Sequence, residues 1–339
     1  MTTSASWNTL LNATCIEKLN SFTDSSAALQ ISPLDYQALF SISGADSQSF
    51  LQGQLTCDMR DVSSQGSRLA AHCTPKGAMV SAMRVVSFND SFLLRVNSAS
   101  TAQCITALNK YMMFSKAQAT DLSEQWVGFG ISGNDALSFI SNHFDNIPTD
   151  VNQSITEQDK VLIKVPGNRY EAWLTLDEAK KWLAEPLLIA ALAPSTLWHK
   201  LDIINGIADV YPQTSGMFIP QMCNLQALAG VSFNKGCYTG QEVITRLHFR
   251  GKLNKQLIIA QFQLDDLNNE NYIAQLVNSK EQNNVGKVLQ SCIIENICYL
   301  QIIINHSKAE NALHLDNDTS LKTLPLPYIL DPDLFTRKV

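Results

Sequence analysis

The sequence predicts an α+β protein in which two related α+β layers are followed by a small β-barrel. Three observations support this prediction. The chain has 339 residues, which is long for a single hydrophobic core. A succession of strand, helix, hairpin and helix occurs twice between residues 29 and 255, and from residue 256 onward the pattern is one of short strands.

Residues 1–28 are rich in Ser, Thr and Asn, and we expect them to form a flexible N-terminal lead-in. The first layer spans approximately 29–125. It opens with a strand-like segment, "DYQALFSISG", which is followed by a short helix over "ADSQSFLQGQL". The segment 78–97 has two β-rich arms around Asn89-Asp90, which predicts a hairpin. A helix with one apolar face, "TAQCITALNKYMMF", completes the layer.

The second layer, approximately 126–255, repeats this order. The strand "WVGFGISG" precedes an amphipathic helix, "NDALSFISNHF", and a hairpin over 160–175 has its turn at Pro166-Gly167-Asn168. A capping-box pattern beginning at Thr175 predicts the next helix. In the C-terminal region, 256–339, runs such as "QLIIAQFQL" and "ENICYLQIIIN" joined by polar turns predict a small barrel or sandwich.

Composition and charge restrict the classes of function. The net charge of −6 argues against a broad nucleic-acid surface, so any basic surface must be local. The first residues do not resemble a signal peptide, and the apolar run at 186–194 is too short to span a bilayer. Eight cysteines without a Cys-x-x-Cys pair or zinc-finger spacing indicate reduced thiols and no metal site. We therefore expect a cytoplasmic protein.

The segment "KGCYTGQE" contains the residues best suited to chemistry. A thiol reacts as the thiolate, and Lys235, two positions before Cys237, is a cation that would lower the thiol pKa. The other members are small or polar residues that are poor material for a core, and the glycines permit close backbone approach to a ligand: Gly236, Tyr238, Gly240, Gln241 and Glu242. An isolated cysteine is more often a small turn residue, here beside a solvated lysine, and it is the polar, glycine-flanked segment that makes a reactive thiol an equally good interpretation.

This motif and three further segments resemble the YgfZ family, folate-binding relatives of the glycine-cleavage aminomethyltransferase. The further segments occur in the family's order: "SGADSQSFLQGQLTCDM", "LAAHCTPKGAM" and "FRGKLNK". The resemblance covers most of residues 31–330. It implies an aminomethyltransferase-like fold with a central folate pocket and a C-terminal β-barrel. It also implies a role in maintaining iron–sulfur enzymes, including those that thiolate tRNA, with the family's cysteine at Cys237 and its lysine at Lys235.

The resemblance further implies a site for tetrahydrofolate or another reduced folate. One of the family's two folate-contacting tryptophans falls on Trp198, and the other falls on Gln37, beside Tyr36. A pterin ring is flat and rich in donors, so Trp198 and Tyr170 could stack on it while the adjacent Glu171 accepts hydrogen bonds. Without the resemblance, Trp198 is equally compatible with an ordinary core residue.

Basic residues occur at alternate positions near the end of the motif region: Arg246, His248, Arg250 and Lys252. On an extended segment they would form one basic face. Through Arg246 and Arg250 such a face could hold the glutamate tail of folate or a phosphate. A charged edge strand that discourages association between sheets is an equally good interpretation.

We therefore expect a folate-binding protein that supports assembly or repair of iron–sulfur enzymes and, through them, tRNA thiolation. Its partners would be those enzymes or their assembly factors, with no direct contact to nucleic acid or membrane. The alternative is a folate-dependent aminomethyltransferase or demethylation enzyme. For that chemistry residues 62–89 contain no Asp or Glu to act as general base, although Asp58 lies just upstream.

Overall fold

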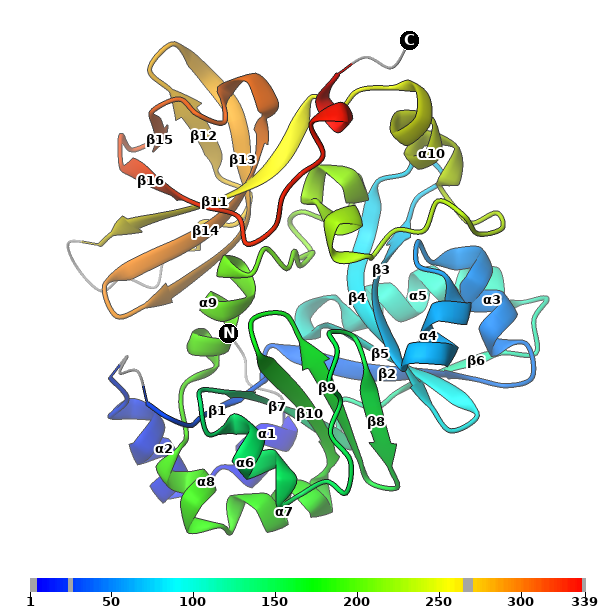
Figure 1. The fold of residues 1–339 in the computed structure, drawn as a ribbon, viewed down its shortest axis with the longest axis vertical. Helices are drawn as coiled ribbons and strands as arrows, with labels where there is room; N and C mark the ends of the chain where they lie inside the picture. Colours follow the sequence, from blue (N-terminus) through cyan, green and yellow to red (C-terminus); the bar gives the residue numbers. More distant parts are fainter. Residues whose placement is uncertain (1–4, 24–26, 265–270, 337–339) are drawn as a thin grey trace. The chain divides into compact units, whose positions relative to one another are not determined.

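The computed structural model describes residues 5–23, 27–264 and 271–336 (Figure 1). The chain divides into two compact units, each assembled from segments that are distant in the sequence. Unit 1 comprises residues 1–50, 59–68 and 84–198. Unit 2 comprises residues 51–58, 69–83 and 199–339. No helix in the described part of the chain is long and apolar enough to cross a membrane.

Two five-stranded sheets precede the barrel, and each is covered by helices of its own layer (Figure 1). The first has the order β3-β4-β5-β2-β6: β2 (Gln37–Ser43), β3 (Ser67–Cys73), β4 (Met79–Phe88), β5 (Ser91–Asn97) and β6 (Gln118–Asp121). The second has the order β8-β9-β10-β7-β1: β1 (Gln30–Pro33), β7 (Trp126–Ser132), β8 (Ser154–Glu157), β9 (Lys160–Val165) and β10 (Arg169–Thr175). The predicted pair of related layers is thereby confirmed.

The layers contain the four predicted helices, at 47–54, 101–112, 136–141 and 176–183, together with further helices that were not predicted. Those of the first layer are α3 (Ser47–Gln54), α4 (Met59–Gln65) and α5 (Thr101–Met112). Those of the second layer are α6 (Ala136–Ser141), α7 (Leu176–Leu183), α8 (Pro186–Ala190) and α9 (Ser195–Ile204). Both predicted hairpin turns are present, and each contains an asparagine with positive φ, Asn89 at 49° and Asn168 at 54°.

The two layers exchange their leading strands. β1 directly precedes β2 in the chain, yet it pairs with β7 of the second sheet. β6 directly precedes β7, yet it pairs with β2 of the first sheet. Each layer therefore supplies one edge strand to the other.

A short repeated motif makes both exchanges possible. The segments "FSISGADSQSF" and "FGISGNDALSF" share Phe, Ile, Ser-Gly, Asp and Ser-Phe at matching positions, and their glycines, Gly44 and Gly133, have φ of 110° and 100°. A Cβ atom at Gly44 would lie 2.3 Å from the carbonyl oxygen of Lys116, just before β6. At Gly133 it would lie 2.4 Å from the carbonyl oxygen of Ala28, just before β1. A side chain at either position would displace the exchanged strand.

The N-terminal residues pack as part of the second layer. α1 (Ala5–Leu10) and α2 (Ala13–Asn20) bring Trp7 and Cys15 into the same apolar core as Phe129. The ring of Trp7 meets that of Phe129 edge-on, with 5.1 Å between the ring centroids. The prediction of a flexible lead-in is therefore wrong for the described residues of this segment.

The C-terminal region forms a closed six-stranded barrel in unit 2, with the order β11-β14-β13-β12-β15-β16. Antiparallel pairing of β11 with β16 closes it. Its strands are β11 (Lys255–Gln263), β12 (Leu276–Ser279), β13 (Gln282–Ile294), β14 (Ile297–Asn305), β15 (Leu313–Leu315) and β16 (Ser320–Leu324). The predicted C-terminal barrel is confirmed.

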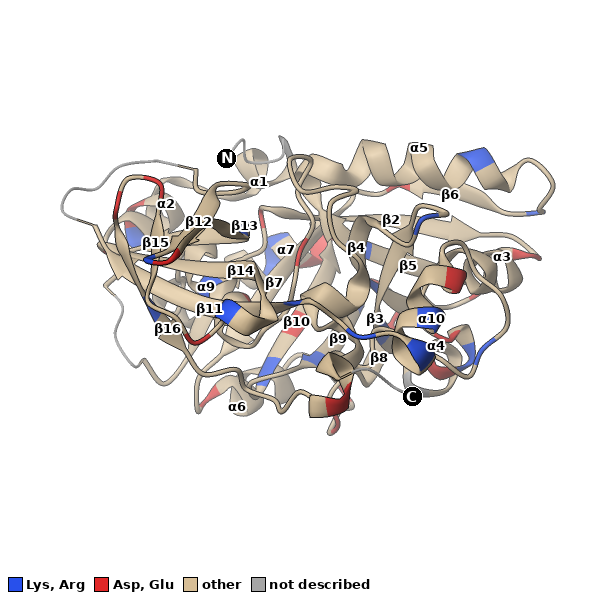
Figure 2. Ribbon diagram, turned by 90° about the horizontal axis from the view of Figure 1, so that it is seen from above, with Lys and Arg blue, Asp and Glu red and all other residues tan. Residues whose placement is uncertain are grey.

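The segment carrying the alternate basic residues departs from the prediction. It is not extended but forms α10 (Gln241–Arg250), whose basic residues are blue in Figure 2. Val243, Ile244 and Leu247 have helical rather than strand spacing, and Ile244 is fully buried. The alternate basic residues therefore do not share one face, and the edge-strand interpretation does not apply.

Candidate functional site

The KGCYTGQE segment forms the loop that leads into α10, and its contacts with residues 53–57 and with Thr74 lie within unit 2. Some of its residues are buried and others are exposed. Lys235, Tyr238 and Gly240 are buried against neighbouring segments, whereas Gly236 and Cys237 are exposed. The loop is thus anchored on one side and open on the other.

Lys235 is the main anchor. Its side chain is only 9% exposed, and its ammonium donates hydrogen bonds to the carbonyl oxygens of Leu55 at 2.8 Å and Cys57 at 2.7 Å. The same ammonium lies 4.9 Å from the ring centroid of Tyr238. The lysine predicted to act on the thiol therefore also joins the motif to the segment 51–58, a role that sequence reasoning missed.

The residues after the cysteine complete the anchoring. The amide of Thr239 donates to the carbonyl of Gly53 at 3.1 Å, and its hydroxyl donates to the side chain of Gln54 at 3.2 Å. Gly240 has φ of 86°, and a Cβ atom there would lie 2.6 Å from the carbonyl oxygen of Thr74. Gly236, by contrast, has nothing within 4 Å of a Cβ position. Only the second glycine is required by packing.

Cys237 is the accessible thiol of the chain. All eight cysteines are free and lie in the described part of the structure, and Cys237 is exposed while the other seven are buried. Burial raises the pKa of several of these thiols, for example that of Cys292 to about 12 and that of Cys73 still further. The anchored loop therefore presents one thiol to solvent, and the rest are shielded.

A second group of predicted site residues lies in unit 1, around Glu171 on β10. This carboxylate is buried, 3.5 Å from the guanidinium of Arg95 and 3.4 Å from the indole nitrogen of Trp173. Burial alone would raise the pKa of Glu171, but Arg95, Arg84, the Trp173 hydrogen bond and Arg169 together hold it below its ordinary value. The carboxylate is therefore ionised at neutral pH.

Trp198 lies on the same face of the second sheet as Glu171. Its indole packs directly on the backbone of Gly130, where a Cβ atom would lie 2.3 Å from the ring, and Gly130 is the register partner of Glu171. The guanidinium of Arg169 lies 4.3 Å from the ring centroid of Trp198. With only 1% of its surface exposed, Trp198 is held firmly in this cluster.

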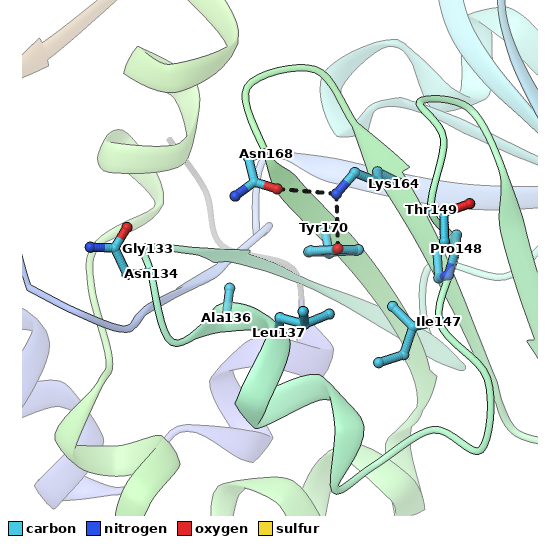
Figure 3. Close-up of a pocket in the computed structure, with 10 residues that line it drawn as sticks. All are labelled: Gly133, Asn134, Ala136, Leu137, Ile147, Pro148, Thr149, Lys164, Asn168 and Tyr170. Carbon is cyan, nitrogen blue, oxygen red and sulfur yellow. Dashed lines mark hydrogen bonds between the residues drawn. The ribbon is translucent and has the colours of Figure 1, made fainter.

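The structure does not bring Tyr170 together with Glu171 and Trp198. Successive residues of a strand point to opposite faces, and Tyr170 belongs to the apolar core on the helix side of the sheet. Figure 3 shows its ring beneath the ammonium of Lys164, which also contacts Asn168. These residues line a separate cavity of about 360 Å³.

The remaining predicted folate contacts belong to different units. Tyr36 and Gln37 are both buried where β2 begins, in unit 1. Arg246 and Arg250 are exposed on α10, in unit 2. Within the described residues, no group of three or more His, Cys, Asp and Glu side chains is arranged to hold a metal ion.

The buried carboxylate is the feature that fits a pterin ring. Well-formed hydrogen bonds to a carboxylate are about 2.7–2.9 Å long. Both contacts of Glu171 are longer, so its oxygens retain acceptor capacity. A donor-rich ring edge is a suitable ligand for such a group.

Comparisons with known proteins agree with this architecture. The family profile described as the GCVT N-terminal domain matches residues 29–156. Among solved structures, the glycine cleavage system aminomethyltransferase T from Bartonella henselae aligns with a TM-score of 0.65, covering 96% of this chain and 91% of that chain. At 13% sequence identity this likeness shows the fold alone, and it confirms the predicted aminomethyltransferase-like fold.

The curated relatives include the tRNA-modifying protein YgfZ of Escherichia coli O127:H6 (strain E2348/69 / EPEC). The two sequences are 32% identical over 310 residues, which is 89% of this chain and 94% of the relative. The similarity thus extends through both α+β layers and into the barrel. On this evidence the chain belongs to the YgfZ family.

Proposed function

We propose that the protein takes part in tRNA modification as a folate-binding accessory factor, which supports the assembly or repair of iron–sulfur enzymes. A curated relative that matches nearly the whole chain is named a tRNA-modifying protein, which supports the first part of the proposal. The observation that carries the second part is Cys237, an exposed thiol on a loop anchored by the buried Lys235.

This arrangement suits a thiol that acts on a partner. The loop is held by hydrogen bonds from Lys235 and Thr239, so Cys237 is presented in one position rather than on a mobile tail. Iron–sulfur clusters are generally held by four protein ligands, most often thiolates. One exposed thiol supplies a single such ligand, so Cys237 would meet a cluster, or the sulfur destined for one, that a partner enzyme holds.

The folate part of the proposal rests on the cluster in unit 1. Glu171 would accept hydrogen bonds from the donor edge of the pterin, and Arg95 would keep the carboxylate ionised and in place. Trp198, whose indole fills the space beside the backbone of Gly130, would flank the ring. Tyr36 is the aromatic residue next to the position of the family's other tryptophan, and we propose it as the further contact. Bound folate would supply one-carbon chemistry.

The folate site is tested by titrating tetrahydrofolate while recording tryptophan fluorescence. Binding should quench the fluorescence, and Glu171→Gln should weaken it because a carboxylate acceptor is lost. Trp198→Ala should weaken binding by at least about 1 kcal/mol. Leu162→Ala, a truncation in the apolar core on the opposite face of β9, serves as a control for general loosening. Unchanged affinity in both site variants would remove this cluster from the folate site.

The role of the thiol is tested in cells that lack the endogenous protein. Cys237→Ser keeps size and hydrogen bonding but removes the soft nucleophile, so it should abolish thiolated nucleosides in tRNA and lower iron–sulfur enzyme activity. The matched control is Gly236→Ala, a change at the neighbouring exposed residue. Full activity with a folded Cys237→Ser protein would show that the thiol is not needed.

No observation favours the alternative transferase. The likeness to aminomethyltransferase T concerns the fold, and the β3–β4 region still has no carboxylate between residues 62 and 89. Asp58 is buried and accepts a hydrogen bond from the amide of Gln52 at 3.2 Å. We expect the purified protein not to transfer an aminomethyl group to tetrahydrofolate, and sustained turnover would overturn this expectation.

A further inference from the structure

α10 presents a basic and aromatic face to solvent. Its exposed side chains are those at positions i, i+4, i+7 and i+8, which form one stripe along a helix: Glu242, Arg246, Phe249 and Arg250. The stripe lies opposite the buried Ile244. Lys252 is exposed two residues after the helix ends. Figure 2 shows the basic residues of α10 in blue.

The cations of this face are not neutralised by any other residue that the structure describes. Among the described residues, Arg246, Arg250 and Lys252 form no ion pair or side-chain hydrogen bond, although the chain as a whole is acidic. Arg246 lies one turn after Glu242 and does not pair with it. An arginine has a planar fork of donors that matches a phosphate group. Two such arginines and the nearby lysine together are complementary to a polyanion.

An exposed aromatic ring lies among these cations. Phe249 is 53% exposed, which is unusual for a large apolar side chain on an otherwise polar helix face. It is held edge-on by His248, at 4.7 Å between ring centroids, and by Phe233, at 6.2 Å. His248 and Phe233 stack on each other in parallel at 3.6 Å. The ring of Phe249 is therefore supported from beneath by a fixed aromatic pair.

We propose that this face of α10 binds a single-stranded segment of RNA, such as a tRNA loop. Arg246, Arg250 and Lys252 would contact phosphates, and an unstacked base would lie on Phe249. An acidic peptide or a polyglutamate tail would use the cations but would leave the aromatic ring without a role. The choice of RNA among polyanions rests on the proposed function in tRNA modification.

This inference revises the expectation of no direct nucleic-acid contact. That expectation follows from the net charge of the whole chain and from an extended conformation of the basic strip. The helix instead joins two arginines and a phenylalanine on one surface, and it begins only a few residues after Cys237. RNA bound there would lie on the same unit as the accessible thiol.

The proposal is tested with the purified full-length protein and a fluorescein-labelled RNA hairpin that has a single-stranded loop. Anisotropy gives Kd over a series of KCl concentrations. Removing two phosphate contacts with Arg246→Gln/Arg250→Gln should weaken binding and reduce the slope of log K against log salt by about 1.4. Phe249→Ala should weaken binding by at least about fivefold while leaving the slope unchanged.

A matched control removes two surface cations elsewhere. Lys180 and Lys181 on α7 are exposed but paired with Asp177 and Glu178, so Lys180→Gln/Lys181→Gln should change neither Kd nor slope. Equal losses in the control and the α10 variants would overturn the proposal. So would an absence of wild-type binding at low salt, or tight binding of a pentaglutamate peptide without binding of RNA.

Failure of this inference can be told apart from failure of the proposed function. The same α10 variants are titrated with tetrahydrofolate, and their affinity for it should equal that of the wild type. Loss of RNA binding together with loss of folate binding would show that α10 acts through the folate site and would overturn a separate RNA surface. The protein could bind RNA while Cys237→Ser leaves tRNA thiolation intact. This pair of results would support the RNA surface on α10 and would contradict only the proposed role of the thiol.

Discussion

The ammonium of Lys235 lies 2.7 Å from the carbonyl oxygen of Cys57, although the two residues are 178 positions apart in the chain. This bond and its companion to Leu55 make the motif lysine part of the protein's tertiary framework. The loop that presents Cys237 is consequently only as stable as its attachment to the segment 51–58.

Replacing this lysine should therefore destabilise the protein. Lys235→Met keeps the apolar stem but leaves two buried carbonyls without charged donors, and each such bond contributes about 1.5–3 kcal/mol. We expect the free energy of unfolding to fall by about 2–4 kcal/mol in a denaturant titration. Lys252→Met, at an exposed position, should change it by less than about 0.5 kcal/mol. Equal stability of the two variants would mean that the lysine is not a structural anchor.

The thiols should differ sharply in reactivity. Treatment of the native protein with iodoacetamide near neutral pH should modify Cys237 alone, because the other seven cysteines are buried. Peptide mass spectrometry identifies the site, and Cys237→Ser should show almost no labelling until denaturant is added. Fast modification of any second cysteine in the folded protein would contradict this assignment.

The two glycines of the motif should respond differently to an added methyl group. Gly240→Ala forces a left-handed backbone on alanine and brings its Cβ against the carbonyl of Thr74, so it should lower the free energy of unfolding by about 2 kcal/mol or more. Gly236→Ala meets nothing and should change it by less than about 0.5 kcal/mol. Thermal melts of both variants check this, and a reversed order would refute the packing argument.

Glu171 should give stability that depends on pH. Its folded-state pKa lies below the ordinary value of 4.5, so its charge stabilises the protein above that pH, and this contribution is lost as pH falls through the folded-state pKa. Glu171→Gln removes the buried ion pair with Arg95 and should cost about 3 kcal/mol at pH 7. The difference from the wild type should shrink as pH falls below 4.5 and through the folded-state pKa. A difference that is constant across this range would show that the carboxylate is not ionised.

His72 should make the stability of the protein depend on pH over a different pH range. Burial lowers its pKa from 6.5 to about 4, so between these values the unfolded chain binds a proton that the folded protein does not. Stability should therefore decrease as pH falls from about 6.5 to about 4. In His72→Gln this part of the slope should be absent, which urea titrations at successive pH values measure. An unchanged slope would assign the effect to other groups, such as His199, whose pKa burial also lowers.

The sequence was informative where local patterns decide the structure. The hairpin at Asn89 and the closed barrel after residue 255 follow from turn residues and short strand-like runs. The prediction for α10 was wrong because Arg246, His248 and Arg250 occupy alternate positions, a pattern that favours a strand. The three-residue spacing of Ile244 and Leu247 indicates a helix. It is the more reliable pattern, because the periodicity of the buried apolar residues determines the secondary structure.

The site was predictable only in part. That Tyr170 and Glu171 face opposite sides follows from their adjacency in a strand, and this signal was available in the sequence. The burial of Lys235 was not predictable, because its carbonyl partners belong to residues 55 and 57 and meet it only through tertiary folding. The repeated Ser-Gly-x-Asp motif is visible in the sequence, but no local pattern predicts that it packs against the segment leading into a strand of the other layer.

The exchange of β1 and β6 means that neither half of the duplicated region is an autonomous folding unit. A cut at the exposed Met113–Phe114 link would leave each fragment without one edge strand, which the other fragment would hold. Each fragment would then carry an open sheet edge and an orphaned strand that fits its counterpart. The severed pieces should therefore aggregate when separated and reassemble when mixed, and loss of either half during evolution would leave the survivor unable to fold.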